Sequence, residues 1–285
     1  MTKPMSILKF FEVFPDNDTC LERLMNTRHG NPIDCPGCGK HSKFHKRKNR
    51  PLYECQWCSY HISPMAGTPF ERSRTPLVKW FYAMYLFTTS RHGVPAKELQ
   101  RQLSVTYKAA WRMGHEIRKY MARVDGDTGL SGHVEVDESM IGGKRKGPRG
   151  RGARGKTVVF GMLERQGDVM TKVVADASRN SLNPIISENV AKGSVVSSDE
   201  WHAYKSLGKD GYQHGTVEHG AEQYVNGIHH VNSIEGFWSR LKNSIRGTHI
   251  HVSKKHLPKY LGEFEYRYNM RANPSLMFDR LLRAF

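Results

Sequence analysis

The chain has 285 residues, and its 44 Lys and Arg against 27 Asp and Glu give a formal net charge of +17 and a pI near 9.7. A chain of this length is expected to form two or three domains with a sizeable core. So large a positive excess indicates a polyanionic partner, and nucleic acid is favoured over a membrane surface. The sequence has no long apolar run and no signal-peptide pattern, so we expect a cytoplasmic protein without a transmembrane helix.

Residues 1–30 are expected to form a short helical lead-in. Apolar side chains recur there at helical spacing on either side of a break at Pro15: Phe10, Phe11, Phe14, Leu21, Leu24 and Met25. Cys20 in this segment is the odd one of five cysteines, and we expect it to be a buried, inert thiol.

Residues 31–68 are expected to form a zinc ribbon. Two CxxC pairs with sixteen residues between them supply four thiolates: Cys35, Cys38, Cys55 and Cys58. Four thiolates complete tetrahedral coordination, so the zinc should be structural and the compartment reducing. A redox dithiol is the rival interpretation, but it does not explain two pairs. His41, His45 and His61 are possible substitute ligands, although four thiolates are enough. The Lys and Arg between the pairs favour a DNA contact over a merely solvated loop.

Residues 75–125 are expected to be strongly helical, and the part from 95 to 118 resembles a helix-turn-helix. Its helices cover 96–103 and about 106–123, with a tight link between them and Thr106 as the cap of the second. The side chains expected to face a DNA major groove are Lys108, Arg112, His115 and Lys119, while Ala109 and Met113 pack inward. An ordinary helical linker bundle is the alternative interpretation. Four aromatic residues are expected in the core rather than against bases: Trp80, Phe81, Tyr85 and Trp111.

Residues 131–285 are expected to form a mixed α/β domain, because short strands alternate there with helices. The expected strands are 134–137, 157–163, 169–175, 194–199 and 214–218, the first three in sequence and antiparallel. The expected helices are 182–191, 200–207, 232–246 and 254–270.

Three acids in this domain occupy positions suited to metal ligands. Asp137 and Asp199 each end a strand, and Glu235 lies on the helix 232–246. Carboxylates from strand ends and a helix can meet above one sheet edge, and three hard oxygen ligands suit Mg²⁺. Lys242 follows Glu235 by seven residues, which returns it to nearly the same helix face two turns on. A metal site with a cation beside it is what phosphoryl transfer on DNA needs.

Neighbouring side chains offer alternatives to this ligand set. Glu135 and Glu138 flank Asp137, and we expect strand alternation to point both away from its face, which makes them poorer ligands. Asn232 could replace Glu235 as the helix ligand, but the step to Lys242 then becomes ten residues and leaves the helix face.

Residues 143–156 carry seven Lys or Arg and no acid, and the segment starts six residues after Asp137. We expect a flexible arm that grips DNA phosphates near the three acids. The contacts expected from it are Lys144, Arg145, Lys146, Arg149 and Arg151. A solvated, disordered hairpin is the alternative.

The spacing of the acids, 62 residues from Asp137 to Asp199 and 36 from there to Glu235, resembles that of the DDE transposases of bacterial insertion sequences. The likeness is greatest to the ISXO-type transposases, which place a zinc ribbon ahead of the catalytic domain. Three motifs carry it: Val136-Asp137-Glu138-Ser139 with Gly142-Gly143-Lys144, then residues 199–204, then residues 230–242. The segment 260–269 fits as well, so the resemblance covers nearly the whole chain. Some relatives have Asn in place of the third acid, whereas this chain has Glu235.

The resemblance implies an RNase H-like catalytic domain after the zinc ribbon and the helix-turn-helix-like segment. It implies catalysis by Asp137, Asp199 and Glu235 with two Mg²⁺ (or Mn²⁺) ions per active site, Lys242 as a phosphate contact, and one structural Zn²⁺. The expected partner is double-stranded DNA, at element ends and target, bound by a homo-oligomer in the nucleoid. The expected function is end binding, strand cleavage and strand transfer. The rivals are a non-catalytic zinc-ribbon regulator derived from a transposase and a metal-dependent nuclease without joining activity.

Overall fold

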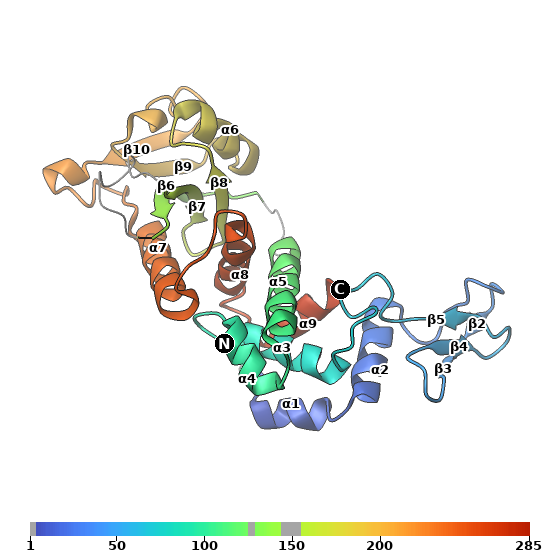
Figure 1. Ribbon diagram of the computed structural model, residues 1–285. Helices are drawn as coiled ribbons and strands as arrows, with labels where there is room; N and C mark the ends of the chain where they lie inside the picture. Colours follow the sequence, from blue (N-terminus) through green and yellow to red (C-terminus); the bar gives the residue numbers. More distant parts are fainter. Residues whose placement is uncertain (1–3, 125–128, 144–154) are drawn as a thin grey trace. The chain divides into compact units, whose positions relative to one another are not determined.

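The computed structural model describes residues 4–124, 129–143 and 155–285, and the chain divides into two compact units (Figure 1). Unit 1 comprises Met1–Val124 together with Ala272–Phe285, and unit 2 comprises Asp125–Arg271. Every helix in these described ranges falls short of the length and hydropathy that crossing a bilayer requires.

The zinc-ribbon segment of unit 1 is built from short strands and turns. Its strands are β1 (Ile33–Asp34), β2 (His41–Ser42), β3 (Phe44–Lys46), β4 (Tyr53–Cys55) and β5 (His61–Ile62). Strands β1 and β2 form an antiparallel pair, and β3, β4 and β5 form an antiparallel sheet. So few residues in strands bury little apolar surface, and we therefore expect the fold of this segment to depend on its cysteines.

The rest of unit 1 is helical. Its helices are α1 (Ile7–Val13), α2 (Asn17–Arg28), α3 (Leu77–Thr89), α4 (Ala96–Leu103), α5 (Tyr107–Val124) and α9 (Met277–Arg283). The side chains of Ser6 and Asp16 accept hydrogen bonds from backbone N–H groups in the first turns of α1 and α2, which caps both helices. Trp80, Phe81 and Tyr85 of α3 are buried, in agreement with the sequence expectation.

The C-terminal helix α9 packs within unit 1, whereas the sequence pattern predicted that the second domain extends to residue 285. The reason is an aromatic cluster that a local sequence pattern does not reveal. The ring of Phe278 lies 5.5 Å from Phe14 and 5.9 Å from Phe81, and Phe285 stacks 4.1 Å from Tyr120. The tail therefore completes the core of the N-terminal helices.

Unit 2 contains one five-stranded sheet in the order β10-β9-β6-β7-β8. The strands are β6 (His133–Ile141), β7 (Thr157–Glu164), β8 (Val169–Val174), β9 (Val195–Asp199) and β10 (Gln213–Val217). Strands β6, β7 and β8 pair antiparallel in sequence, and β9 and β10 then add parallel to β6 on its other side. All five expected strands are present, with boundaries shifted by a few residues.

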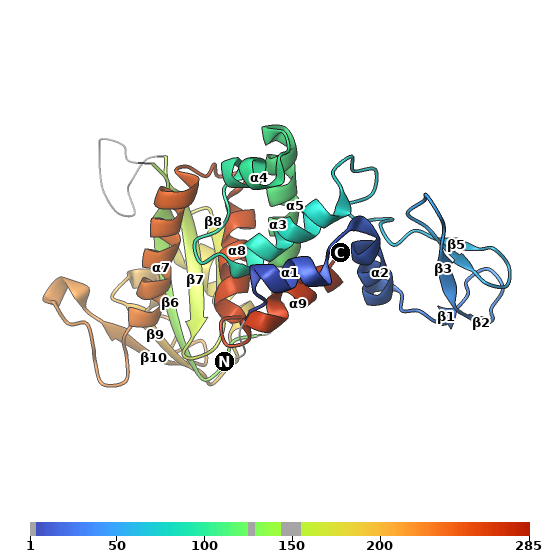
Figure 2. The same cartoon turned by 90° about the horizontal axis from the view of Figure 1, so that it is seen from below.

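Helices cover both faces of this sheet. Helix α6 (Arg179–Asn189) packs through Leu182 and Ile186 against Val134 and Val136 of β6. Helices α7 (Asn232–Ser244) and α8 (Leu257–Asn269) pack on the opposite face, and Figure 2 shows α7 lying along β6 and β7. Both faces of the sheet are therefore buried, and polar groups on its strands need specific partners.

Two expected helices differ from the observed ones. In place of a helix over 200–207 there is a short 3₁₀ helix, η2 (His202–Tyr204), because the Asp199 carboxylate accepts a hydrogen bond from Trp201 N–H at 3.0 Å and holds a turn there. The helix expected over 232–246 is α-helical only to Ser244 and continues as a π-helical turn, η4 (Ile245–His249).

Candidate functional site

The four predicted zinc ligands converge in unit 1. The Sγ atoms of Cys35 and Cys58 lie 3.6 Å apart, those of Cys38 and Cys55 lie 4.0 Å apart, and all four lie within 4.8 Å of one another. Sulfur ligands at about 2.3 Å from a tetrahedral zinc are separated by about 3.8 Å. The four thiols therefore fit one structural zinc ion.

Groups around the cysteines support this assignment. Ser42 Oγ lies 3.0 Å from Cys55 Sγ, and the backbone N–H of Trp57 donates to the same sulfur at 3.4 Å. Such donors stabilise a metal-bound thiolate. His41 pairs instead with Asp34, at 2.9 Å.

The other alternative groups of this region also have separate roles. His61 lies 3.8 Å from the Glu54 carboxylate, so it is engaged outside the cysteine cluster. Cys20 is fully buried, and burial raises the pKa of its thiol to about 12. This agrees with the expected inert thiol.

The helix-turn-helix-like segment is formed by α4 and α5. Ser104 between them has a left-handed backbone (φ 49°), and Thr106 Oγ1 accepts a hydrogen bond from Ala109 N–H at 3.2 Å, as expected of the cap. The predicted DNA contacts Lys108 and Arg112 are exposed at the start of α5.

Two expectations for α5 are wrong. His115 is buried, with 4% of its surface exposed, and its ring lies 4.0 Å from Trp111. Trp111, expected in the core, is 40% exposed. The buried face of α5 contains Ala110, Met113, His115 and Ile117, and Trp111 lies outside this face.

The predicted basic arm, with Lys144, Arg145, Lys146, Arg149 and Arg151, lies outside the described residues.

The first two acids of unit 2 lie on neighbouring parallel strands. The ladder between β6 and β9 pairs His133 with Val195 and Glu135 with Ser197. The same register, continued by two residues, brings Asp137 level with Asp199 at the end of β9. Residues that are level on adjacent parallel strands point to the same face, and this is the face that α7 covers.

The third acid is carried by α7, which packs closely over that face. Gly161 of β7 is the cross-strand partner of Asp137, and a Cβ at Gly161 would come within 2.5 Å of the Trp238 ring. The missing side chain therefore lets α7 lie against β7 beside Asp137. Glu235 lies at the edge of α7, 46% exposed, with its Oε1 atom 3.8 Å from His219 Nδ1.

The carboxylates interact electrostatically across this face. Burial, together with the negative charges of Glu138, Asp199 and Glu235, raises the pKa of Asp137 to about 8. Burial lowers the pKa of Lys242, whereas the charge of Asp137 raises it.

The donor set suits a divalent cation. Hard carboxylate oxygens are the preferred ligands of Mg²⁺, and a cation between them would relieve their mutual repulsion. In the described ranges, the four cysteines are the only group of three or more His, Cys, Asp or Glu side chains that lie close enough together to hold a metal ion, so the three acids do not form such a group. The three acids lie on the α7 face of the sheet and are close enough to interact electrostatically.

The flanking glutamates differ from each other. Glu138 faces the α6 side, as expected, and its Oε2 atom accepts a hydrogen bond from Tyr204 Oη at 2.5 Å. The expectation for Glu135 is wrong: it precedes Asp137 by two residues, so alternation places it on the same face. Glu135 is fully buried, and its carboxylate accepts a hydrogen bond from Arg165 Nε at 2.7 Å. It is engaged in structure rather than free to bind metal.

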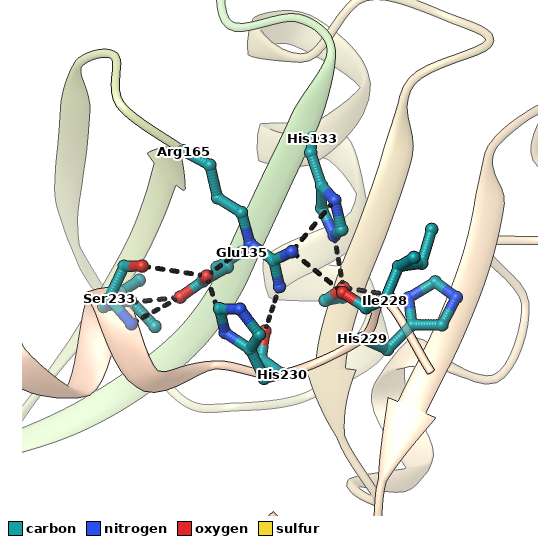
Figure 3. A network of polar contacts seen from close by, with 9 residues as sticks. His133, Glu135, Arg165, Ile228, His229, His230 and Ser233 are labelled. Carbon is teal, nitrogen blue, oxygen red and sulfur yellow. Dashed lines mark hydrogen bonds and ion pairs between the residues drawn. The ribbon is translucent and has the colours of Figure 1, made fainter. Parts of the chain in front are cut away.

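Glu135 joins β6 to the start of α7 (Figure 3). Its carboxylate accepts hydrogen bonds from Ser233 N–H at 2.8 Å, Ile234 N–H at 3.0 Å and Ser233 Oγ at 3.0 Å. His230 Nδ1 lies 3.1 Å away. The first N–H groups of a helix have no partner within the helix, so a carboxylate supplied by β6 caps α7 and complements its dipole. The contact fixes the helix that carries Glu235 to the strand that carries Asp137.

Arg165 extends this network to the neighbouring strand (Figure 3). Its Nη1 atom donates to His133 Nδ1 at 3.1 Å, His133 Nε2 lies 2.8 Å from Ser197 Oγ, and Ser197 Oγ lies 2.9 Å from His229 Nδ1. Arginine only donates, so His133 is neutral with its proton on Nε2. Burial, reinforced by the Arg165 charge, lowers the pKa of His133 to about 4. Arg165 was not predicted from the sequence. The available signal was Glu135, an acid on the same strand face as Asp137, which needs a cationic partner when it is buried.

Comparison with known proteins shows two matches along the chain. Residues 129–269 match the ISXO2-like transposase domain, and residues 15–61 match the transposase zinc-ribbon domain. An uncharacterized protein in transposable element ISH50 of Halobacterium salinarum is 28% identical over 271 residues, which cover 88% of this chain and 90% of that protein. An uncharacterized transposase-like protein of Haemophilus influenzae is 30% identical over 101 residues, which cover 35% of this chain and 80% of that protein.

Proposed function

Since this chain belongs to the family of ISXO2-like transposases with a transposase zinc ribbon, we propose that it cuts and joins DNA at element ends in a Mg²⁺-dependent DDE reaction. One observation carries the proposal: Asp137 and Asp199 are level on adjacent parallel strands, under the helix that bears Glu235. The proposed substrate is double-stranded DNA, which the +17 charge favours.

The strand order of unit 2 supports an RNase H-like catalytic domain. Three antiparallel strands in sequence, two further strands parallel to the first, and helices on both faces form a sheet with its acids at the centre. The central strands β6 and β9 supply two acids, and α7 supplies the third.

In the proposed mechanism, Asp137, Asp199 and Glu235 would hold Mg²⁺ or Mn²⁺, two ions per site. The bound metal would supply activation of the attacking water or 3′-OH and stabilisation of the leaving 3′-oxygen. Because the pKa of Asp137 is raised to about 8, a cation that binds there near neutral pH would have to displace a proton from the carboxyl group. Lys242, close enough to interact with Asp137, holds a phosphate as a point charge.

The remaining parts are proposed to bind and orient DNA. Lys108 and Arg112 on the exposed start of α5 would contact the DNA near an element end. The basic arm would grip phosphates near the cut, and the chain would act as a homo-oligomer on nucleoid DNA. Hydrolysis at the element end would then be followed by attack of the freed 3′-OH on target DNA.

The test uses purified zinc-loaded protein and a duplex that carries the terminal sequence flanking the gene. Cleavage and joining should require Mg²⁺ or Mn²⁺ and should be lost in Asp137→Ala, Asp199→Ala and Glu235→Ala, with end binding largely retained. Lys242→Ala should lower the cleavage rate on the order of 10²-fold relative to the wild-type protein, because it misplaces the substrate without removing a metal ligand. Cleavage without joining would favour the nuclease, and binding without cleavage by the wild-type protein would favour the regulator.

A further inference from the structure

We infer that a basic pocket of unit 2, formed by Lys156, Lys242 and Arg246, binds a backbone phosphate of the DNA beside the phosphate that is cut. The pocket is a cavity of about 660 Å³ between the end of β6, the start of β7 and the end of α7 with the turn after it. Its walls include Ser139, Gly143 and His251. The position of the cut rests on the proposed function, whereas the pocket and its charge do not.

The charge of the pocket points to an anion. The side chains of Lys156 and Arg246 form no hydrogen bond or ion pair with any residue that the structure describes. Both charges act on the partly buried Lys242 and lower its pKa, in addition to its burial. Glu138 also lines the cavity, but its carboxylate is engaged by Tyr204. Lys156 and Arg246, which have no anionic partner among the described residues, repel Lys242 and each other, and a bound phosphate would offset that repulsion.

The backbone at the rim of the pocket is unusual. The π-helical turn η4 ends at Ile250, which has φ 63° and ψ −52°, and His251 N–H donates to His249 C=O at 2.6 Å. This is a γ-turn of the rare, strained kind, and its central residue is β-branched and 83% exposed. Because the Ile250 side chain is exposed, no gain from burying it offsets the cost of this backbone conformation. Strained turns and π-helical segments of this kind concentrate at functional sites.

The location of the pocket favours a DNA phosphate as its ligand over a free anion. Lys242 lines the pocket and interacts electrostatically with Asp137, so an anion held here lies near the carboxylate face. The guanidinium of Arg246 offers a planar set of donors that suits phosphate oxygens, and the two lysines add point charges. A duplex cut at the carboxylates would therefore place an adjacent phosphate in the pocket.

The experiment measures binding without chemistry. Full-length zinc-loaded protein is titrated, in the absence of divalent cation, with a series of element-end duplexes that each carry one neutral methylphosphonate near the cut. The variants are Arg246→Gln and Lys156→Gln, with Arg240→Gln as the control, because Arg240 is an exposed arginine of α7 that does not line the pocket. Thermal unfolding verifies that each variant is folded.

We expect Arg246→Gln to bind the unmodified duplex about tenfold more weakly, the size of one lost charge-assisted contact. One methylphosphonate position should weaken wild-type binding by a similar factor and have no further effect in Arg246→Gln or Lys156→Gln. Arg240→Gln should keep the wild-type response. If both pocket variants respond to every methylphosphonate as the wild-type protein does, the pocket holds no phosphate. Free inorganic phosphate that competes with DNA as strongly as a duplex does would also overturn the assignment. Failure of cleavage on every duplex would reject the proposed function but leave this result intact.

Discussion

The two candidate metal sites of this protein are assembled in opposite ways. The four cysteines come from two turns within 24 residues, and their sulfur atoms already lie within 4.8 Å of one another. The three acids come from β6, β9 and α7, and repulsion among them adds to the burial that raises the pKa of Asp137 to about 8. The cysteine site therefore depends on local sequence and metal, whereas the acid site depends on the packing of α7 against the sheet. Substitutions can perturb the cysteine site or the packing of α7 one at a time.

The largest effect is expected from breaking the cysteine site. Cys35→Ser removes one of four thiolates from a segment with little apolar core, and structural zinc contributes about 10–16 kcal/mol to the folding of such segments. We expect residues 31–62 to unfold while unit 2 keeps its fold. Zinc analysis and hydrogen exchange would follow both units at once. Cys20→Ala is the matched control and should retain one zinc per chain, and an active, zinc-free wild-type protein would refute the site.

The next effect is expected from Glu135, on which the acid site depends. Glu135→Ala leaves the partly buried Arg165 without its carboxylate and uncaps α7, so unit 2 should lose about 3–5 kcal/mol of stability in urea unfolding. Exchange of the Ser233 and Ile234 amides should accelerate.

The control for this change is another fully buried glutamate, Glu263, which pairs with Arg267 within α8. Glu263→Ala should also destabilise unit 2 but should leave the Ser233 and Ile234 amides protected. Equal exchange of those amides in both variants would mean that Glu135 contributes general stability and does not hold α7 in place.

A smaller effect is expected from Gly161→Ala. The added Cβ would come within 2.5 Å of Trp238 and push α7 away from β7 beside Asp137, at a cost of about 1–3 kcal/mol. Gly236→Ala is the control on the same helix, because a Cβ there would meet no described atom within 4 Å other than its chain neighbours and the backbone of its own helix, and it should raise stability by up to about 1 kcal/mol. Urea unfolding measures both. Equal stability changes would show that α7 shifts freely on the sheet.

The same contrast explains which features the sequence could predict. The CxxC pairs and the cap at Thr106 are local, so spacing and residue type predicted them, and the strands of unit 2 followed from alternation. The choice of Asp137, Asp199 and Glu235 followed from their positions and spacing, and it stays a prediction.

Features that depend on distant partners were missed. The local sequence shows Glu135 only as one more acid on a strand. Its role depends on hydrogen bonds from Ser233 and Ile234 of α7, which follow it by 98 and 99 residues. The place of Phe278 in unit 1 depends on Phe14, far away in the chain. Trp111 was expected in the core because it is aromatic, but the direction of the buried stripe on α5 decided otherwise.

The smallest expected effect is a pH dependence of the stability of unit 2, and it comes from His133. Burial and Arg165 lower its folded-state pKa from an ordinary 6.5 to about 4, so the unfolded chain binds a proton first as the pH falls. The stability that neutral His133 contributes is fully present above pH 6.5 and is lost progressively as the pH falls from 6.5 toward 4. Glu135 opposes this shift, whereas His229 and His230 act in the same direction as Arg165.

The test compares wild-type protein with His133→Asn at each pH, because the difference cancels the titration of groups that both proteins share, including the zinc thiolates. The advantage of the wild-type protein in melting temperature should be constant from pH 8 to about 6.5 and should shrink below it. Since Arg165 also donates to the carbonyls of Ile228 and His230, it keeps part of its network in the variant, and the advantage should be modest. An advantage that does not change down to pH 4 would mean that His133 accepts a proton without loss, and that the chain from Arg165 through His133 to Ser197 does not require a neutral ring.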